Sequence, residues 1–150
     1  MNTVELYQEL THTLESFLSK VEQADLKNHI YEHWDIKDIV GHITYWHINY
    51  AANLKACDQK RKPPLLKGKY IDLNQKGVDE MRKYSFKELR KKLLDANLVI
   101  GNVVRKGDVR KVKYKEGTRD YSIEEFLQVI TSHIKGHIRD VRRTLKKTES

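Results

Sequence analysis

The chain is poor in the residues that cross-link, kink or anchor a protein. Its single cysteine, Cys57, rules out an internal disulfide and fits a reducing compartment. The two prolines, Pro63 and Pro64, are adjacent, which leaves long stretches free to form helix. No apolar run approaches the roughly 20 residues that span a bilayer, and the first residues lack the basic and apolar segments of a signal peptide. The sequence therefore predicts a cytoplasmic protein without a membrane span.

Positive charge is in excess, with a net charge of +8, which raises the question of a nucleic-acid partner. Acidic residues such as Glu88 and Asp140 interrupt most of the basic runs. The chain also lacks a zinc finger, a basic zipper and the aromatic signature of RNA-binding domains. We interpret the charge as solvated helix faces and do not expect specific nucleic-acid binding.

Four long segments are predicted to be amphipathic helices, and each begins with a residue that can cap a helix. The caps are Asn2, Asp35, Ser85 and Ser122. Apolar residues then recur with a period near 3.6. They are Val4, Tyr7, Leu10, Leu14, Phe17, Leu18 and Val21; Ile36, Ile39, Val40, Ile43, Trp46, Tyr50 and Leu54; Phe86, Leu89, Leu93, Ile100 and Val104; and Ile123, Phe126, Leu127, Ile130, Ile134, Ile138, Val141 and Leu145. The pattern predicts an all-α protein, a four-helix bundle formed by one domain over residues 1–150.

Two connections between these helices are less regular. Residues 65–84 are predicted to contain a short helix, and residues 106–119 a loop in which brief alternation allows some extended pairing. Between the first two helices, His29 and His33 flank a short connection, and we expect both at the surface.

A histidine pair on the last helix is the most informative feature. His133 and His137 are four residues apart, so their rings leave the same helix face about 5–6 Å apart. That spacing allows two ring nitrogens to bind one divalent cation. Both lie on or beside the apolar stripe, so they are expected to face the interior.

A third histidine, His42, lies beside the buried face of the second helix. Gly41 precedes it at a cost of about 1 kcal/mol in helix propensity, which is tolerable where another helix or a ligand approaches closely. If the second and last helices are neighbours, His42, His133 and His137 can converge on one cation, as in other bundle metal sites. Alternatively, they are ordinary core histidines bonded to carbonyls or carboxylates.

An ordered set of motifs covers nearly the whole chain: Trp34-x-x-Lys37-Asp38-x-x-Gly41-His42-x-x-x-Trp46, then Asp72-Leu73-Asn74-Gln75, then Tyr121-Ser122-x-Glu124-Glu125 before His133-x-x-x-His137. This set resembles the DinB superfamily, and Gly-His-Ile-Thr-Tyr-Trp resembles its DfsB-type members. The resemblance implies a four-helix bundle, frequently a homodimer, in which His42, His133 and His137 bind nickel, zinc or a similar divalent ion. Members often carry an acidic residue where this chain has His47, which could alter the surroundings of the metal or add a titrating group.

Three neutral imidazoles would leave such an ion with at least one open position. The ion could lower the pKa of a bound water toward ~7, or bind a thiolate. The resemblance therefore implies a metal-dependent enzyme acting on a small molecule, either as a hydrolase or as a transferase that uses a low-molecular-weight thiol. The sequence does not choose between them. The alternatives are a non-catalytic metal-binding protein and a basic, nucleic-acid-associated bundle.

Other catalytic readings of the sequence are weaker. Ser132 points about 100° away from His133 on a helix, and Cys57 has no evident base. Glu9 and His12 form one Glu-x-x-His motif, whereas a di-iron bundle needs two. The aromatic residues near the histidines, Tyr45, Trp46, Tyr50 and Tyr121, fit either core packing or a substrate cavity. Asn74 could orient a ligand, although capping of the short helix is the simpler interpretation.

Overall fold

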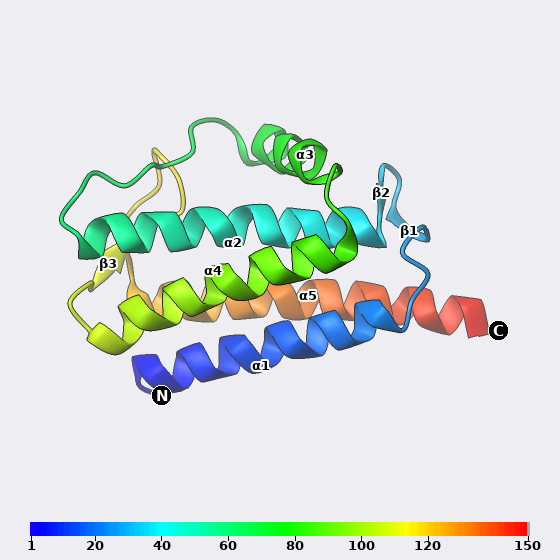
Figure 1. Cartoon of the computed structure of the whole chain (residues 1–150), viewed down its shortest axis with the longest axis horizontal. Helices are drawn as coiled ribbons and strands as arrows, with labels where there is room; N and C mark the ends of the chain where they lie inside the picture. The colour runs from blue at the N-terminus through cyan, green and yellow to red at the C-terminus, as the bar shows by residue number, and fades with distance from the viewer. Residues whose placement is uncertain (150) are drawn as a thin grey trace.

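A computed structural model of the chain describes the backbone of residues 1–149 and the side chains of residues 1–146. Within this part the elements follow in the order α1 (Thr3–Glu22), β1 (His29–Tyr31), β2 (Trp34–Asp35), α2 (Ile36–Asp58), α3 (Tyr70–Met81), α4 (Phe86–Lys106), β3 (Lys111–Val112), β4 (Tyr121–Ser122) and α5 (Ile123–Glu149). The four long helices α1, α2, α4 and α5 form the bundle, and α3 lies outside it against α2 (Figure 1). The predicted bundle and the short helix within residues 65–84 are confirmed.

Each long helix begins where the sequence provides a cap. Reciprocal hydrogen bonds between a cap and the residue three positions later join Asn2 with Glu5, Asp35 with Asp38, Ser85 with Glu88, and Ser122 with Glu125. Such pairs satisfy backbone N–H groups that the first helical turn leaves without a partner. The start of each helix is therefore determined locally.

The core forms where the predicted apolar faces meet. Helix α1 packs mainly against α5, and α2 packs mainly against α4 and α3. The largest fully buried side chains are Phe17, Phe126, Leu10, Leu14, Ile36, Ile39, Leu54, Leu89, Leu93, Ile100, Leu127 and Ile134. Val4 is an exception among the predicted core positions, since it remains 37% exposed in the first turn of α1.

Two glycines allow α3 to approach α2 closely. A Cβ on Gly41 would lie 2.9 Å from the Cβ of Met81, at the end of α3. A Cβ on Gly77 would lie 2.4 Å from the ring of Tyr45. The expectation that Gly41 marks a close approach by another helix is therefore confirmed.

Two short antiparallel hairpins flank the bundle. β1 pairs with β2, and β3 pairs with β4, which confirms extended pairing in the connection before α5. The first hairpin places Tyr31 against α5. The second places the ring centroids of Tyr114 and Tyr121 4.6 Å apart. As expected, His29 and His33 are exposed.

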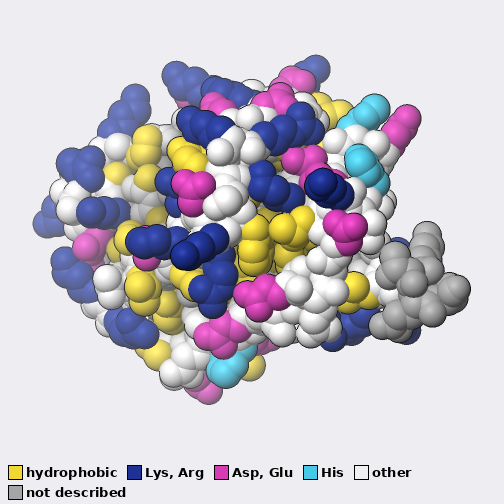
Figure 2. Space-filling model, turned by 45° about the vertical axis from the view of Figure 1, so that its right-hand side comes forward, with side chains coloured by type: hydrophobic (Ala, Val, Ile, Leu, Met, Phe, Trp, Pro, Cys, Tyr) yellow, Lys and Arg dark blue, Asp and Glu magenta, His cyan; other side chains and the backbone are white. Residues whose placement is uncertain are grey.

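Lys and Arg side chains are spread over the upper and left-hand parts of the face drawn in Figure 2, with Asp and Glu side chains among them. Several charged side chains of the described part of the chain form ion pairs, among them Arg82 with Asp38 and Lys106 with Asp58. None of the described helices is long and apolar enough to cross a bilayer.

Candidate metal centre and adjoining pocket

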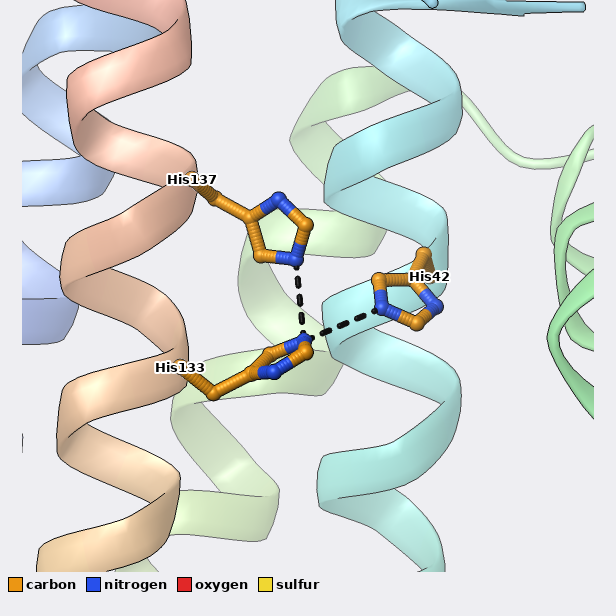
Figure 3. A group of neighbouring side chains, drawn as sticks. All are labelled: His42, His133 and His137. Carbon is orange, nitrogen blue, oxygen red and sulfur yellow. Dashed lines mark hydrogen bonds between the residues drawn. The ribbon is translucent and has the colours of Figure 1, made fainter. Parts of the chain in front are cut away.

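Three histidines from two helices converge on one point between α2 and α5 (Figure 3). His133 Nε2 lies 3.0 Å from His137 Nε2 and 3.5 Å from His42 Nε2. One ring nitrogen from each residue falls within 4.8 Å of the other two. The structure therefore brings together the three histidines that the sequence analysis singled out.

These spacings suit a shared cation. Nitrogens that bind one ion at roughly 2.1 Å lie roughly 3.0 to 3.4 Å apart in octahedral or tetrahedral geometry. The Nε2 atoms of His42 and His137 approach His133 at close to those distances. In the described part of the chain, this is the one group of three such side chains that could hold a metal ion.

The environment keeps all three rings neutral. Burial lowers the pKa of His42 to about 3, helped by repulsion from His137 and His133. Burial also lowers the pKa of His137 to about 4, assisted by His133 and opposed by Asp140, and it lowers the pKa of His133. A neutral imidazole has a free nitrogen lone pair, so each side chain is ready to bind a cation at neutral pH.

A tyrosine and a carboxylate lie next to the Nδ1 atom of His137. The Tyr31 hydroxyl donates a hydrogen bond to Asp140 and lies 3.4 Å from His137 Nδ1. Since the hydroxyl proton points to Asp140, its oxygen can accept from Nδ1–H of His137. That arrangement selects the tautomer whose Nε2 lone pair faces the other histidines. Neither residue was predicted from the sequence to belong to the site, although Asp140 lies on the same helix face as His137, three residues later.

His133 differs from the expectation that both histidines of α5 face the interior. His42 and His137 are buried, at 5% and 9% exposure, whereas His133 is an exposed residue, although its ring is covered enough for burial to lower its pKa. The reason is the limited contact between α2 and α5, which leaves a cavity of about 390 Å³ open to solvent along His133. The histidine cluster is thus accessible to a small molecule.

Aromatic and aliphatic side chains form the rest of the cavity. It is lined by His42, Ile43, Trp46, His47, Tyr50, Tyr70, Asn74, Tyr114, Tyr121, Val129, Ile130, His133 and Ile134. These residues come from α2, α3, α5 and the segment around the β3–β4 hairpin. A largely apolar cavity of this size with a few polar groups is typical of small-molecule sites.

The cavity decides two questions that the sequence left open. Trp46, Tyr50 and Tyr121 line it, whereas Tyr45 packs against α3 and does not. The interpretation of Asn74 as a helix cap is wrong. Helix α3 begins four residues earlier without a side-chain cap, and Asn74 Oδ1 instead accepts a hydrogen bond of 2.7 Å from the Trp46 indole.

The weaker catalytic candidates stay apart from the cavity. Ser132 is exposed and is not among the residues that line the cavity. Burial raises the pKa of the Cys57 thiol, with a contribution from Asp120, so Cys57 is not an activated nucleophile. Glu9 pairs with Lys135, and His12 is exposed on α1.

His47 lines the cavity but belongs to a different hydrogen-bond network. Its Nε2 lies 3.0 Å from Asn97 Oδ1, and the Asn97 amide donates to the hydroxyls of Thr11 and Tyr7. His47 therefore links the cavity to α4 and α1 rather than to the histidine cluster. Full burial lowers its pKa to about 4, despite the opposing effect of Asn97.

Replacing His47 should reduce the acid sensitivity of the fold. A histidine in the unfolded chain has a pKa near 6.5, so the unfolded state binds a proton at His47 more readily than the folded state does. The stability that neutral His47 allows above pH 6.5 is therefore lost as the pH falls toward 4. Between pH 7 and pH 5, wild type should lose about 2 kcal/mol more unfolding free energy than His47→Gln, measured by urea denaturation of metal-free protein. Equal losses in the two proteins would contradict a buried neutral His47.

The chain is similar to known proteins in its structure but not in its sequence. No protein-family model matches the chain, and no curated protein matches it. The mycothiol-dependent maleylpyruvate isomerase superposes with a TM-score of 0.74 at 11% identity, and a histidine-to-alanine mutant of it with a TM-score of 0.75 at 11% identity. Each comparison covers 94% of this chain, which spans 61% of the isomerase chain. An uncharacterised protein from Clostridium difficile 630 superposes with a TM-score of 0.71 at 16% identity, over 97% of this chain and 96% of that one.

These similarities establish the class of fold. The chain has the DinB-like helical-bundle fold, as the sequence resemblance implied. A shared fold does not define a function, which depends on the chemistry of the site.

Proposed function

We propose that the protein is a metal-dependent enzyme that joins or rearranges small molecules with the help of a low-molecular-weight thiol. His42, His133 and His137 are the proposed ligands of one zinc or nickel ion. The observation that carries the proposal is the convergence of three neutral imidazoles at the wall of an open cavity of about 390 Å³. A purely structural ion would need neither an open cavity nor an exposed ligand.

The lining of the cavity favours thiol chemistry over hydrolysis. Metal-dependent hydrolases of the His-Glu-x-x-His type rely on a nearby carboxylate as general base. No Asp or Glu is among the described residues that line the cavity. When bound, the ion would supply a positive centre that favours the thiolate form of a small thiol, which needs no further base. The structural similarity to a mycothiol-dependent isomerase points the same way.

The protein's own residues have separate tasks in this proposal. His42 and His137 hold the ion from the buried side, while His133 holds it at the mouth where a thiol enters. The Tyr31–Asp140 pair keeps His137 in the tautomer that presents Nε2. The aromatic residues of the cavity exclude water from the second reactant.

Cobalt-substituted protein provides a direct test. Adding N-acetylcysteine should produce sulfur-to-cobalt charge-transfer absorption, whereas S-methyl-N-acetylcysteine should not. The cobalt content after gel filtration must be unchanged, so that thiol binding is not confused with extraction of the ion. Cobalt-loaded protein that shows no thiol band, but whose zinc form hydrolyses an activated ester in a His133-dependent way, would overturn the thiol proposal in favour of a hydrolase.

Tyr31→Phe should weaken metal binding without removing a ligand. The substitution deletes the oxygen that accepts from His137 Nδ1–H, so the preference for the binding tautomer is lost. Loss of such a partner typically reduces metal affinity about 10- to 100-fold, and a tenfold increase in the zinc dissociation constant is expected. Competition with a chromophoric chelator measures it.

Tyr84→Phe is the matched control for this substitution. The Tyr84 ring contacts Lys83 and Lys92 and lies outside the histidine cluster, so its hydroxyl should not affect zinc affinity. A Tyr31→Phe protein with wild-type zinc affinity would show that the tyrosine does not position His137.

A further inference from the structure

A buried hydrogen-bond network fixes the orientation of the groups around His47, which lines the cavity. Tyr7 donates its hydroxyl hydrogen to the backbone carbonyl of Asn97, and Thr11 donates its own to the backbone carbonyl of Tyr7. Each hydroxyl oxygen can then only accept, and both accept from the side-chain NH₂ group of Asn97. The amide oxygen of Asn97 therefore points the other way, at His47 Nε2, 3.0 Å away.

The same network decides which nitrogen of His47 carries the hydrogen. Asn97 Oδ1 can only accept a hydrogen bond, so His47 Nε2 must be the donor. Burial lowers the pKa of His47 to about 4, so at neutral pH the ring holds this one hydrogen and Nδ1 keeps a free lone pair. His47 therefore acts as a hydrogen-bond acceptor toward any group that lies at Nδ1.

The Nδ1 atom of His47 is left without a protein partner but is not sealed off. It forms no hydrogen bond with any described residue. In that part of the chain, the fully buried side-chain nitrogen and oxygen atoms that lack a hydrogen bond are His42 Nδ1, Asn53 Oδ1 and Asp58 Oδ1. Since His47 Nδ1 is not one of them, it remains accessible, and the space next to His47 is the cavity.

The walls around His47 are aromatic and carry no charge. The Tyr50 ring centroid lies 6.1 Å from that of His47 and 5.9 Å from that of Trp46, and the Trp46 centroid lies 5.8 Å from that of Tyr70. Such rings pack well against another flat ring. None of the described residues that line the cavity is Asp, Glu, Lys or Arg, so a charged group beside His47 would lose its hydration without a partner. This part of the cavity favours a neutral, planar molecule.

We infer that the cavity binds a neutral, planar molecule, such as an aromatic hydroxyl or N–H compound, through a hydrogen bond that this molecule donates to His47 Nδ1. The role of this ligand as the second reactant rests on the proposed function. Its binding does not, because His47 belongs to the network with Asn97 and not to the group of three histidines. His47 is then the residue that determines the specificity of the cavity for a donor group.

Indole and benzofuran test the inference, because they are neutral bicyclic molecules of nearly the same shape and only indole has an N–H group. NMR titration of zinc-loaded wild type should give about fivefold tighter binding of indole, as expected for one net hydrogen bond. His47→Phe removes the acceptor and should reduce this preference to within about twofold. The control Asn53→Leu removes another buried polar side chain from α2, outside the cavity lining, and should keep the preference. Asn53 Oδ1 already lacks a hydrogen bond, so an apolar side chain of similar size should be tolerated there.

The wild-type protein gives a second readout, which decides the question even if His47→Phe does not fold. In a long-range proton–nitrogen correlation spectrum, assigned by comparison with His47→Gln, Nδ1 should be the unprotonated nitrogen of His47. Indole should shift its signal toward the protonated range, whereas benzofuran should not. An unprotonated Nε2, or equal affinities for indole and benzofuran in wild type, would overturn the inference. A preference for indole that survives in folded His47→Phe would overturn it as well.

The test is separate from that of the proposed function. The preference for indole should be the same in metal-free protein, since neither the His47–Asn97 bond nor indole involves the ion. The cobalt–thiol experiment involves neither His47 nor indole, so its failure would leave this preference unchanged.

Discussion

Protein carrying His137→Ala, purified without chelator or added metal, should contain only background levels of divalent metal, against about one zinc or nickel ion per chain in wild type. His137 is one of three ligands whose nitrogens meet at 3.0 and 3.5 Å, and two imidazoles alone hold an ion far more weakly. Elemental analysis gives the content. His12→Ala, which removes an exposed histidine from α1 outside the cluster, should leave it unchanged.

Thermal unfolding supplies a second readout for the same substitution. An ion that binds only the folded state stabilises it by about 2.7 kcal/mol at a concentration of 100 times its dissociation constant. Added zinc should therefore raise the melting temperature of wild type and of His12→Ala, but not that of His137→Ala. Wild-type protein that is metal-free and also fails to bind added zinc or nickel would contradict the metal site, and the histidines would then be ordinary polar members of a bundle core.

The helices were predictable because their signals are local. Asn2 and Glu5, or Ser85 and Glu88, are three residues apart, and their reciprocal hydrogen bonds depend on one helical turn. The face of each helix that is buried likewise follows from the spacing of its apolar residues. The architecture then follows from burying four such faces together.

The site was only partly predictable because it depends on the register between helices. The spacing of His133 and His137 is local to one helix. Their distance from His42 depends instead on how α2 packs against α5, and His42 lies 91 residues before His133 in the sequence. The resemblance to a known superfamily, rather than the spacing, supplied that link. The exposure of His133 was missed for the same reason, because the cavity depends on how little α2 and α5 touch.

Asn74 and Tyr31 illustrate contacts that local patterns cannot reveal. Asparagine is common at helix starts, so capping was the natural interpretation of Asn74, yet its partner is Trp46, 28 residues away. Tyr31 lies in a short hairpin with no helical pattern, and its partner Asp140 is 109 residues away. Both residues act through tertiary contacts on the side chains that line or support the candidate site.

Phe126→Ala should cost about 3–5 kcal/mol of unfolding free energy and also damage the aromatic wall of the cavity. Phe126 is fully buried. Its ring stacks on that of Tyr114, with the centroids 4.9 Å apart, and lies edge-on to that of Tyr50, with the centroids 5.2 Å apart. Both tyrosines line the cavity, so the void left behind Phe126 allows their rings to shift. Urea denaturation measures the stability loss. Phe126→Leu, which leaves a smaller void, should cost about 1–2 kcal/mol.

Phe17→Ala separates lost stability from damage to the cavity. Phe17 is also fully buried, but it belongs to α1 and is not part of the cavity lining, so its truncation should destabilise the fold by a similar 3–5 kcal/mol. Under conditions in which circular dichroism shows the variants folded, the indole NMR signal of Trp46, whose ring lies against Tyr50, should keep its wild-type position in Phe17→Ala but shift in Phe126→Ala and Phe126→Leu. Zinc content should be unchanged in all three, because neither phenylalanine touches a histidine of the cluster. Equal shifts of the Trp46 signal in the Phe17 and Phe126 variants would mean that the cavity responds to general loosening of the bundle, and that Phe126 has no particular role in holding the aromatic side chains of the cavity.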